Sequence, residues 1–403
     1  MQTSILGTNF WLESALRSAA SISGRCLWSG NRATWLLPRQ GSSPTVFAPA
    51  SIDLYDGIAG ICYFLALAAA ATSDTRIKIT ALAASRTIID KLTSELAIPE
   101  MSSWTGKVGV AWVLYKIGLL LDDECSHEAA FRALDSIDLN GPHQVDVVAG
   151  SAGALLKLRD FPSSPIVSRI ALRCCEVIKR AAVNEEGAIS WRTVDNSRRH
   201  LTGYAHGSSG IAAGLAEGWQ ITGDAELLSL LEGAFAYDDS CFSQIAGNWP
   251  DYREFTSQAR GTPSFAVSWC HGAPGIGLAR MLCCDLDPSK KQFIGWMIAA
   301  LDTTLDFTLK NVGPDFSACL CHGSMGNADI LLEAGRTMAM PDYVFGAEQI
   351  AVAAMRIYGP ETRSWPSGHI ARQQSPSLML GEAGLGYFFL RLALSEGSPS
   401  ILI

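Results

Sequence analysis

The tripeptide Cys-His-Gly occurs twice in this chain, at residues 270–272 and 321–323. Each copy is followed, three residues after its glycine, by a second glycine and then by an apolar run. Cysteine sulfur and histidine nitrogen are preferred zinc ligands, and three protein ligands with an open fourth position are typical of catalytic zinc sites. Two interpretations follow: the cysteines and histidines gather around a metal, or the two copies are units of an internal repeat.

The Gly-x-x-Gly spacing recurs along the whole chain and favours a repeat. It appears seven times, and successive first glycines lie between 44 residues (Gly106 to Gly150) and 65 residues (Gly207 to Gly272) apart. A period of this size indicates an architecture built from one supersecondary unit. The first glycines are Gly57, Gly106, Gly150, Gly207, Gly272, Gly323 and Gly381.

Each repeat predicts an inner helix and an outer helix. The nearly uncharged run after each glycine pair must be buried on every face, and glycine lets backbones approach closely because it has no Cβ. Between these runs, apolar residues recur at helical spacing with charges opposite. We therefore predict an all-α fold, an (α/α)7 double-layered helical toroid, with an open solenoid as the alternative. The predicted outer helices lie at 9–22, 76–96, 164–183, 224–237, 290–310 and 341–359.

Four segments without helical periodicity interrupt the repeats. They are rich in Trp, Pro, Gly and Ser, and loops this long are usually functional or carry small strands. No linker separates them from the helices, so we predict one domain spanning residues 1–403. The segments are 24–52, 184–203, 238–267 and 360–378.

Composition restricts the partners and the compartment. The net charge of −8 with no long basic run argues against nucleic acid or an anionic membrane as the main partner. The 11 cysteines lack the regular spacing of a disulfide framework, and the first residues do not resemble a signal peptide. The longest apolar run, 57–72, is shorter than the ~18–20 residues that span a bilayer. We therefore expect a cytoplasmic protein with reduced thiols.

The repeat register predicts which residues meet at one mouth of the ring. If the glycine loops begin the inner helices, the residues just before each first glycine are neighbours in space. Cys270, Cys321 and His322 then form a candidate zinc site. Cys319 could compete as a ligand but falls outside the register. The other cysteines are interpreted as buried apolar residues: Cys26, Cys62, Cys125, Cys174, Cys175, Cys241, Cys283 and Cys284.

Three further residues in or near this register are candidates for acid–base chemistry. His206 suits proton transfer near neutral pH, although it could instead be a structural histidine. Asp146, four residues before Gly150, could orient a histidine or cap the following helix. His271 aligns with His322 and could be a fourth ligand, a hydrogen-bond donor to a ligand, or an acid.

These motifs together resemble the lanthionine synthetase C-like cyclase family. The resemblance rests on the seven glycine units, "WCHGAPGIGLAR", "LCHG", "AHG" and "LMLGEAGLGYFFLRL", and runs from about residue 9 onward. "NWPDYR" at 248–253 and the closing "GSPSILI" make the sequence most similar to the cyclase half of type II bifunctional lanthipeptide synthetases. No counterpart of their dehydratase half is found in the sequence.

The resemblance implies a fold, a cofactor and partners. It implies a ring of helices holding Zn²⁺ through Cys270, Cys321 and His322, with His206 as the acid–base histidine and Asp146 as its aspartate. It also implies a dehydrated precursor peptide as substrate, a separate dehydratase, and a membrane-associated maturation and export complex. Some members carry an arginine shortly before the first zinc cysteine, whereas the nearest one upstream here is Arg260.

Three other functions compete with peptide cyclisation. The same zinc site could present glutathione or another thiol to a dehydroamino acid. A closed site using His271 or Cys319 as fourth ligand would instead suit a non-catalytic scaffold subunit. Rings of helix pairs also serve glycosidases, which need two facing carboxylates, and the glycine loops offer Asp56 and Asp146.

Overall fold

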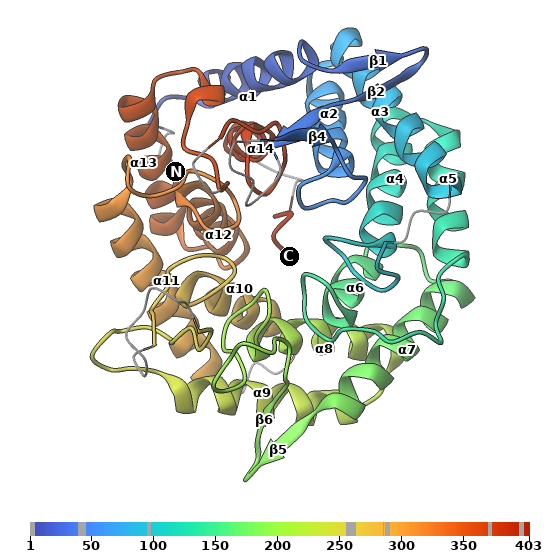
Figure 1. Ribbon diagram of the computed structural model, residues 1–403. Helices are drawn as coiled ribbons and strands as arrows, with labels where there is room; N and C mark the ends of the chain where they lie inside the picture. The colour runs from blue at the N-terminus through green and yellow to red at the C-terminus, as the bar shows by residue number, and fades with distance from the viewer. Residues whose placement is uncertain are drawn as a thin grey trace.

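The computed structural model describes residues 5–38, 46–94, 98–254, 263–284, 286, 291–369, 373–394 and 399–403. In this part of the chain there are fourteen α-helices, one short 3-10 helix and three two-stranded antiparallel sheets. The helices form two concentric layers around a centre (Figure 1). No described helix is long and apolar enough to cross a membrane.

Seven helices form the inner layer, and each begins directly after the first glycine of a repeat. Consecutive inner helices contact one another around the ring, and the last, α14, contacts the first, α2, so the ring is closed (Figure 1). Most of their residues are buried, as their mainly apolar sequences require. They are α2 (Ile58–Thr72), α4 (Lys107–Leu121), α6 (Ser151–Leu158), α8 (Ser208–Thr222), α10 (Ala273–Cys283), α12 (Ser324–Thr337) and α14 (Glu382–Ala393).

The outer layer also has seven helices, and each packs against an inner one. Helix α1 packs on α14, so the two ends of the repeat series meet. Helix α1 is also joined to α13, because Trp11 Nε1 donates a hydrogen bond to Glu348 Oε1 at 2.9 Å. The toroid prediction is confirmed. The outer helices are α1 (Thr8–Ser23), α3 (Thr75–Thr93), α5 (Glu124–Asp135), α7 (Pro165–Ala181), α9 (Glu226–Cys241), α11 (Lys291–Asn311) and α13 (Pro341–Tyr358).

The glycine pairs exist because the loop before each inner helix folds back onto the helix. A Cβ on the second glycine of a pair would meet the carbonyl oxygen six residues earlier: at Gly109 it would lie 1.6 Å from Ser103 O. The first glycines are also crowded by backbone, but only Gly272 has a positive φ, of 82°. Close approach, more than backbone conformation, therefore selects glycine here.

The loops are hydrogen-bonded to one another around the mouth of the ring. In all repeats but one, the residue two positions before the first glycine donates its amide to the carbonyl oxygen at the same position of the next repeat. The bonds run from Tyr55 to Trp104 (3.0 Å), Trp104 to Val148 (3.4 Å), Val148 to Ala205 (3.3 Å), Ala205 to Cys270 (3.2 Å), Cys321 to Met379 (3.1 Å) and Met379 to Tyr55 (3.0 Å).

One link in this series is missing. Among the described residues, no main-chain hydrogen bond joins Cys270 to Cys321. We call the junction between loop 268–272 and loop 319–323 the seam. It is the place where both Cys-His-Gly tripeptides meet.

The irregular segments carry the short strands, as predicted. The described part of 238–267 has isolated bridges only, with Asp251 opposite Ser264 and Arg253 opposite Ser197; residues 255–262 lie outside the described residues. The prediction of a single domain stays a prediction. The remaining elements are β1 (Leu27–Ser29), β2 (Arg32–Thr34), β3 (Leu36–Pro38), β4 (Phe47–Pro49), β5 (Val183–Glu185), β6 (Ala188–Ser190) and the 3-10 helix η1 (Thr362–Ser364).

Candidate active site

The seam brings the two predicted cysteine ligands into contact. Cys321 is 5 % exposed and accepts a hydrogen bond from Tyr55 OH at 2.9 Å, and the Sγ of the partly buried Cys270 lies 3.2 Å from Ser268 Oγ. The hydrogen bond between the two thiols lowers the pKa of Cys270 and raises that of Cys321. The two sulfurs therefore form a soft donor pair at the mouth of the ring.

The third predicted ligand, His322, lies beside a different thiol. Its amide donates to Cys319 Sγ at 3.5 Å. The negative charge of Cys319 raises the pKa of His322 to about 9, against the effect of burial. Burial acts to raise the pKa of Cys319, but the neighbouring imidazolium lowers it overall. Cys319, which the repeat register left out, is thus part of the site.

The donor set suits zinc, although ligation stays a prediction. Two thiols and an imidazole are ligands that zinc takes in three-ligand sites, and the contact between Cys270 and Cys321 matches a shared ion. However, the described residues contain no group of three or more His, Cys, Asp or Glu side chains arranged to hold a metal.

The predicted acid–base pair is assembled across two loops. His206 Nδ1 lies 2.6 Å from Asp146 Oδ2; the imidazole is 27 % exposed and the carboxylate 3 %. Asp146 Oδ1 accepts the Ala149 amide at 2.7 Å, so its role is to hold the loop and the histidine rather than to cap α6. Because the carboxylate accepts from Nδ1–H, the tautomer inferred from this bond leaves Nε2 to exchange protons.

His271 lies deeper than its counterpart in the other tripeptide. It is 1 % exposed, its ring centre lies 6.0 Å from that of His206, and Nδ1 lies 3.8 Å from Asp251 Oδ2. Neither ring nitrogen has a hydrogen-bond partner among the described residues. Burial lowers its pKa, so the imidazole is neutral at neutral pH. The three roles considered for it stay predictions.

An arginine that the sequence analysis did not identify lies beside the thiols. Arg253 forms a two-pronged ion pair with Asp251, with Nη2–Oδ2 at 2.7 Å and Nε–Oδ1 at 3.1 Å. Burial disfavours its charge, but Asp251 and the sulfurs of Cys270 and Cys321 raise its pKa overall. Arg253 belongs to "NWPDYR", the only sequence signal that pointed to it, whereas Arg260 lies outside the described residues.

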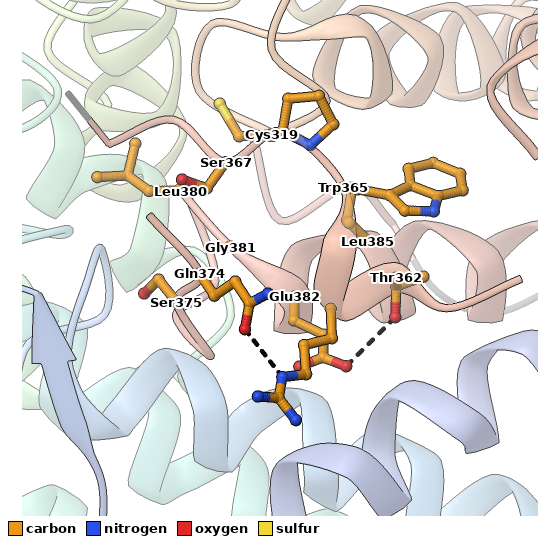
Figure 2. A pocket seen from close by; sticks show the side chains of 12 residues that line it. Cys319, Thr362, Trp365, Ser367, Gln374, Ser375, Leu380, Gly381, Glu382 and Leu385 are labelled. Carbon is orange, nitrogen blue, oxygen red and sulfur yellow. Dashed lines mark hydrogen bonds between the residues drawn. The ribbon is translucent and has the colours of Figure 1, made fainter. Parts of the chain in front are cut away.

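Behind Cys319 the structure leaves little space. Figure 2 shows the pocket, in which Thr362 donates to Glu382 and Arg363 donates to Gln374. Its volume of about 10 Å³ has room for roughly one water molecule.

Comparison with known proteins identifies the family of this chain. The family profile described as "Lanthionine synthetase C-like protein" matches residues 48–403, and the chain belongs to this family. The "Lacticin 481/lactococcin biosynthesis protein LcnDR2" of Lactococcus lactis subsp. lactis is 28% identical over 193 residues, which are 46% of this chain and only 18% of that protein.

A solved structure has the same fold. The structure named "Nisin cyclase" is similar to this chain with a TM-score of 0.62 and 18% identity, covering 85% of this chain and 88% of that one. At this identity the likeness shows the fold, which supports the double-layered toroid.

Proposed function

We propose that this chain is a zinc-dependent lanthipeptide cyclase, which closes thioether rings by adding peptide cysteine thiols to dehydroalanine or dehydrobutyrine. The observation that carries the proposal is the meeting of Cys270 and Cys321 at the mouth of the ring, in a family member that also pairs His206 with Asp146 there. The reaction forms a carbon–sulfur bond in a dehydrated precursor peptide, in the cytoplasm.

The proposed ligands are Cys270, Cys321 and His322. A free thiol has a pKa near 8.5 and is mostly protonated at neutral pH, and zinc bound here would supply a deprotonated substrate thiol. Arg253 places a positive charge near the two sulfurs and so balances part of the negative charge of the ligand set.

The reaction also requires that one proton be delivered to the α-carbon of the substrate. Attack of the sulfur on the β-carbon moves the carbon–carbon double-bond electrons toward the α-carbon and the amide oxygen. In the proposal, His206 donates a proton to the α-carbon through Nε2 while Asp146 holds Nδ1. The proton lost by the thiol and the proton gained by the α-carbon balance.

The proposal includes partners that supply the substrate. The precursor must already be dehydrated, so a separate dehydratase acts first, and a membrane-associated maturation and export complex takes the product. The match to LcnDR2 covers only a small part of that protein, so dehydration is not assigned to this chain.

Ring closure leaves the mass of a peptide unchanged, so the test counts thiols. A peptide with one cysteine and one dehydroalanine is incubated with the zinc-loaded protein and then alkylated, and mass spectrometry measures the fraction without an alkyl group. We expect that fraction to rise faster with the wild type than with Cys321→Ser. Equal rates for both proteins and for buffer would contradict the proposal. A product heavier by one glutathione, when glutathione is added, would favour thiol conjugation instead.

One observation favours a second candidate, a non-catalytic scaffold with a closed metal site. Cys319 lies beside His322 and could complete a four-ligand set. In that case Cys319→Ser would weaken zinc binding as much as Cys321→Ser does, whereas a catalytic site with three ligands keeps its zinc without Cys319.

A further inference from the structure

Residues 400–402 are buried inside the ring, while Pro399 is exposed and Ile403 is partly buried. The end of the chain marked C in Figure 1 is surrounded by the inner helices. Ile401 is 2 % exposed and Leu402 is fully buried. We call residues 399–403 the brace.

The brace is bonded directly to the residue before the first zinc cysteine. Leu402 O accepts a hydrogen bond from Trp269 Nε1 at 2.9 Å, and Trp269 is fully buried next to Cys270. The Trp269 ring packs edge-on against Trp104, with ring centres 5.3 Å apart. Any shift of Leu402 is therefore transmitted to the loop that carries Cys270.

On the other side of the seam, the brace is bonded to α12, the helix that follows Cys321 and His322. Ser400 Oγ donates to Asp329, and Ser400 N donates to Glu333 Oε2 at 3.0 Å. Both carboxylates are buried and also accept hydrogen bonds from Arg391 of α14. The brace is thus hydrogen-bonded both to the loop that carries Cys270 and to the helix that follows Cys321, so it connects the two sides of the seam.

A buried lysine fixes the brace in place. Lys157 of α6 is 3 % exposed, and its Nζ donates to Ile401 O at 3.1 Å and to Ile403 O. The amino group lies over two indole rings, 5.2 Å from the centre of Trp104 and 4.7 Å from that of Trp112. Burial lowers the pKa of Lys157 to about 7. A polar group this deeply buried is costly unless it is hydrogen-bonded, so the bonds to the brace account for its position.

We propose that the brace is a positioning element for the metal site, which holds Cys270 in register with Cys321 across the seam where the main-chain ring is open. Elsewhere around the mouth, amide–carbonyl bonds keep neighbouring loops in register; at the seam the described links are side-chain ones, the hydrogen bond between the Cys270 and Cys321 thiols and that from Asn327 Nδ2 to Val267 O at 3.0 Å. The inference deepens the proposed function and rests on it for the metal measurement.

The test compares Lys157→Met with Lys116→Met. Lys116 also lies over Trp112, at 5.3 Å from the ring centre, but is bonded to Asp160 and not to the brace, so it is a matched control. Co²⁺ affinity is measured by competition with a chelator, and the Co²⁺–thiolate absorption is recorded. We expect Lys157→Met to lower the affinity about tenfold, as is usual when groups supporting metal ligands are removed. Lys116→Met should remain within about twofold of the wild type.

A second variant keeps the test valid if Lys157→Met does not fold. Trp269→Phe keeps an aromatic ring but loses the bond to Leu402 O, and it should weaken Co²⁺ binding in the same way. Wild-type affinity in a folded Lys157→Met and in Trp269→Phe would overturn the proposal.

Hydrogen exchange of the metal-free proteins separates this inference from the proposed function. Lys157→Met should speed amide exchange in loops 268–272 and 319–323 about tenfold while leaving loop 55–57, which Lys157 does not contact, at the wild-type rate. A uniform increase in all loops, or no increase, would show that the brace only adds overall stability. If the wild type binds no metal, the proposed function fails while this measurement still decides the role of the brace.

Discussion

The pair of His206 and Asp146 has the geometry of an acid–base unit. A carboxylate that is almost fully buried holds one nitrogen of a partly exposed imidazole at 2.6 Å. In such pairs the carboxylate fixes the tautomer and orientation of the histidine. Proton transfer by His206 and its orientation by Asp146 therefore both depend on the hydrogen bond between these two side chains.

Asp146→Asn tests that dependence. The amide has the shape of the carboxylate but cannot stabilise the imidazolium, so we expect ring closure to slow by about 10²–10⁴-fold with zinc content unchanged. Thiol counting by mass spectrometry gives the rate. His200→Gln serves as control, because His200 bonds to Ser190 away from the site and should leave the rate unchanged. A wild-type rate in Asp146→Asn would contradict the assignment.

Cys319→Ser and Cys321→Ser form a matched pair within one loop. If Cys321 is a ligand and Cys319 only contacts His322, the second variant loses zinc and the first keeps about one zinc per chain. Metal analysis after dialysis measures both. Loss of zinc from both proteins would make both cysteines ligands, as in the closed site, whereas loss from Cys319→Ser alone would move the ligand assignment to Cys319.

The sequence predicted this site only as far as the repeat register reached. The register placed Cys270 beside Cys321 and His206 near Asp146, because equivalent loops meet at one mouth of a ring. It did not identify Arg253, which comes from an irregular segment with no periodicity. It also could not show the contact between Cys319 and His322, which depends on side-chain orientation.

At the scale of the helices, each glycine pair acts as a packing contact between a loop and the helix that follows. The second glycine lies so close to a carbonyl oxygen that no side chain fits. A Cβ on Gly210 would lie 1.8 Å from Tyr204 O, whereas one on Gly295, exposed in α11, would meet nothing within 4 Å.

Gly210→Ala and Gly295→Ala should therefore have opposite effects. We expect the first to lower the free energy of unfolding by about 3 kcal/mol, because backbone must move to relieve the clash. The second should raise it by roughly 0.5–1 kcal/mol, the usual gain for alanine over glycine inside a helix. Urea unfolding followed by circular dichroism measures both. A neutral Gly210→Ala would show that close approach does not explain the motif.

A buried carboxyl between two helices makes stability depend on pH. Asp238 of α9 accepts a hydrogen bond from Ser209 of α8, and burial raises its pKa to about 7. Between the unfolded pKa near 4 and pH 7 the folded state binds the extra proton, so stability falls as pH rises through this window. Asp238→Asn should therefore gain stability over the wild type from pH 4 to 7, reaching on the order of 4 kcal/mol.

Denaturant midpoints of both proteins across that range measure the difference. A constant difference would contradict a raised pKa. The prediction concerns α8 and α9 only, so zinc binding at the seam should be the same in both proteins.

Most helices were predictable because their apolar residues recur along the chain. Helix α5 was missed although its buried residues, Ala129, Ala130, Ala133 and Leu134, lie on one face at helical spacing. Small strands were expected in the irregular segments, but the bounds of those in 24–52 could not be predicted, because three residues are too few to show an alternating apolar pattern.

At the scale of the whole molecule, closure of the ring follows from the mainly apolar character of the inner helices. An open solenoid would expose them to water, and the contact of α14 with α2 removes that exposure. The path of the brace could not be predicted, because "GSPSILI" is too short to carry a pattern. The seam too is a property of the folded ring, since sequence gives the order of the loops but not which neighbours are hydrogen-bonded.

The central claim is that the seam holds an open, thiol-binding zinc site. Zinc K-edge X-ray absorption of the purified protein, before and after adding a cysteine-containing peptide, tests it most directly, with Cys321→Ser alongside. The account predicts about one zinc per chain bound by two protein sulfurs and a nitrogen, a further sulfur when the thiol is added, and no zinc in the variant. Zinc whose ligands do not change with thiol, or a wild type without zinc, would contradict it.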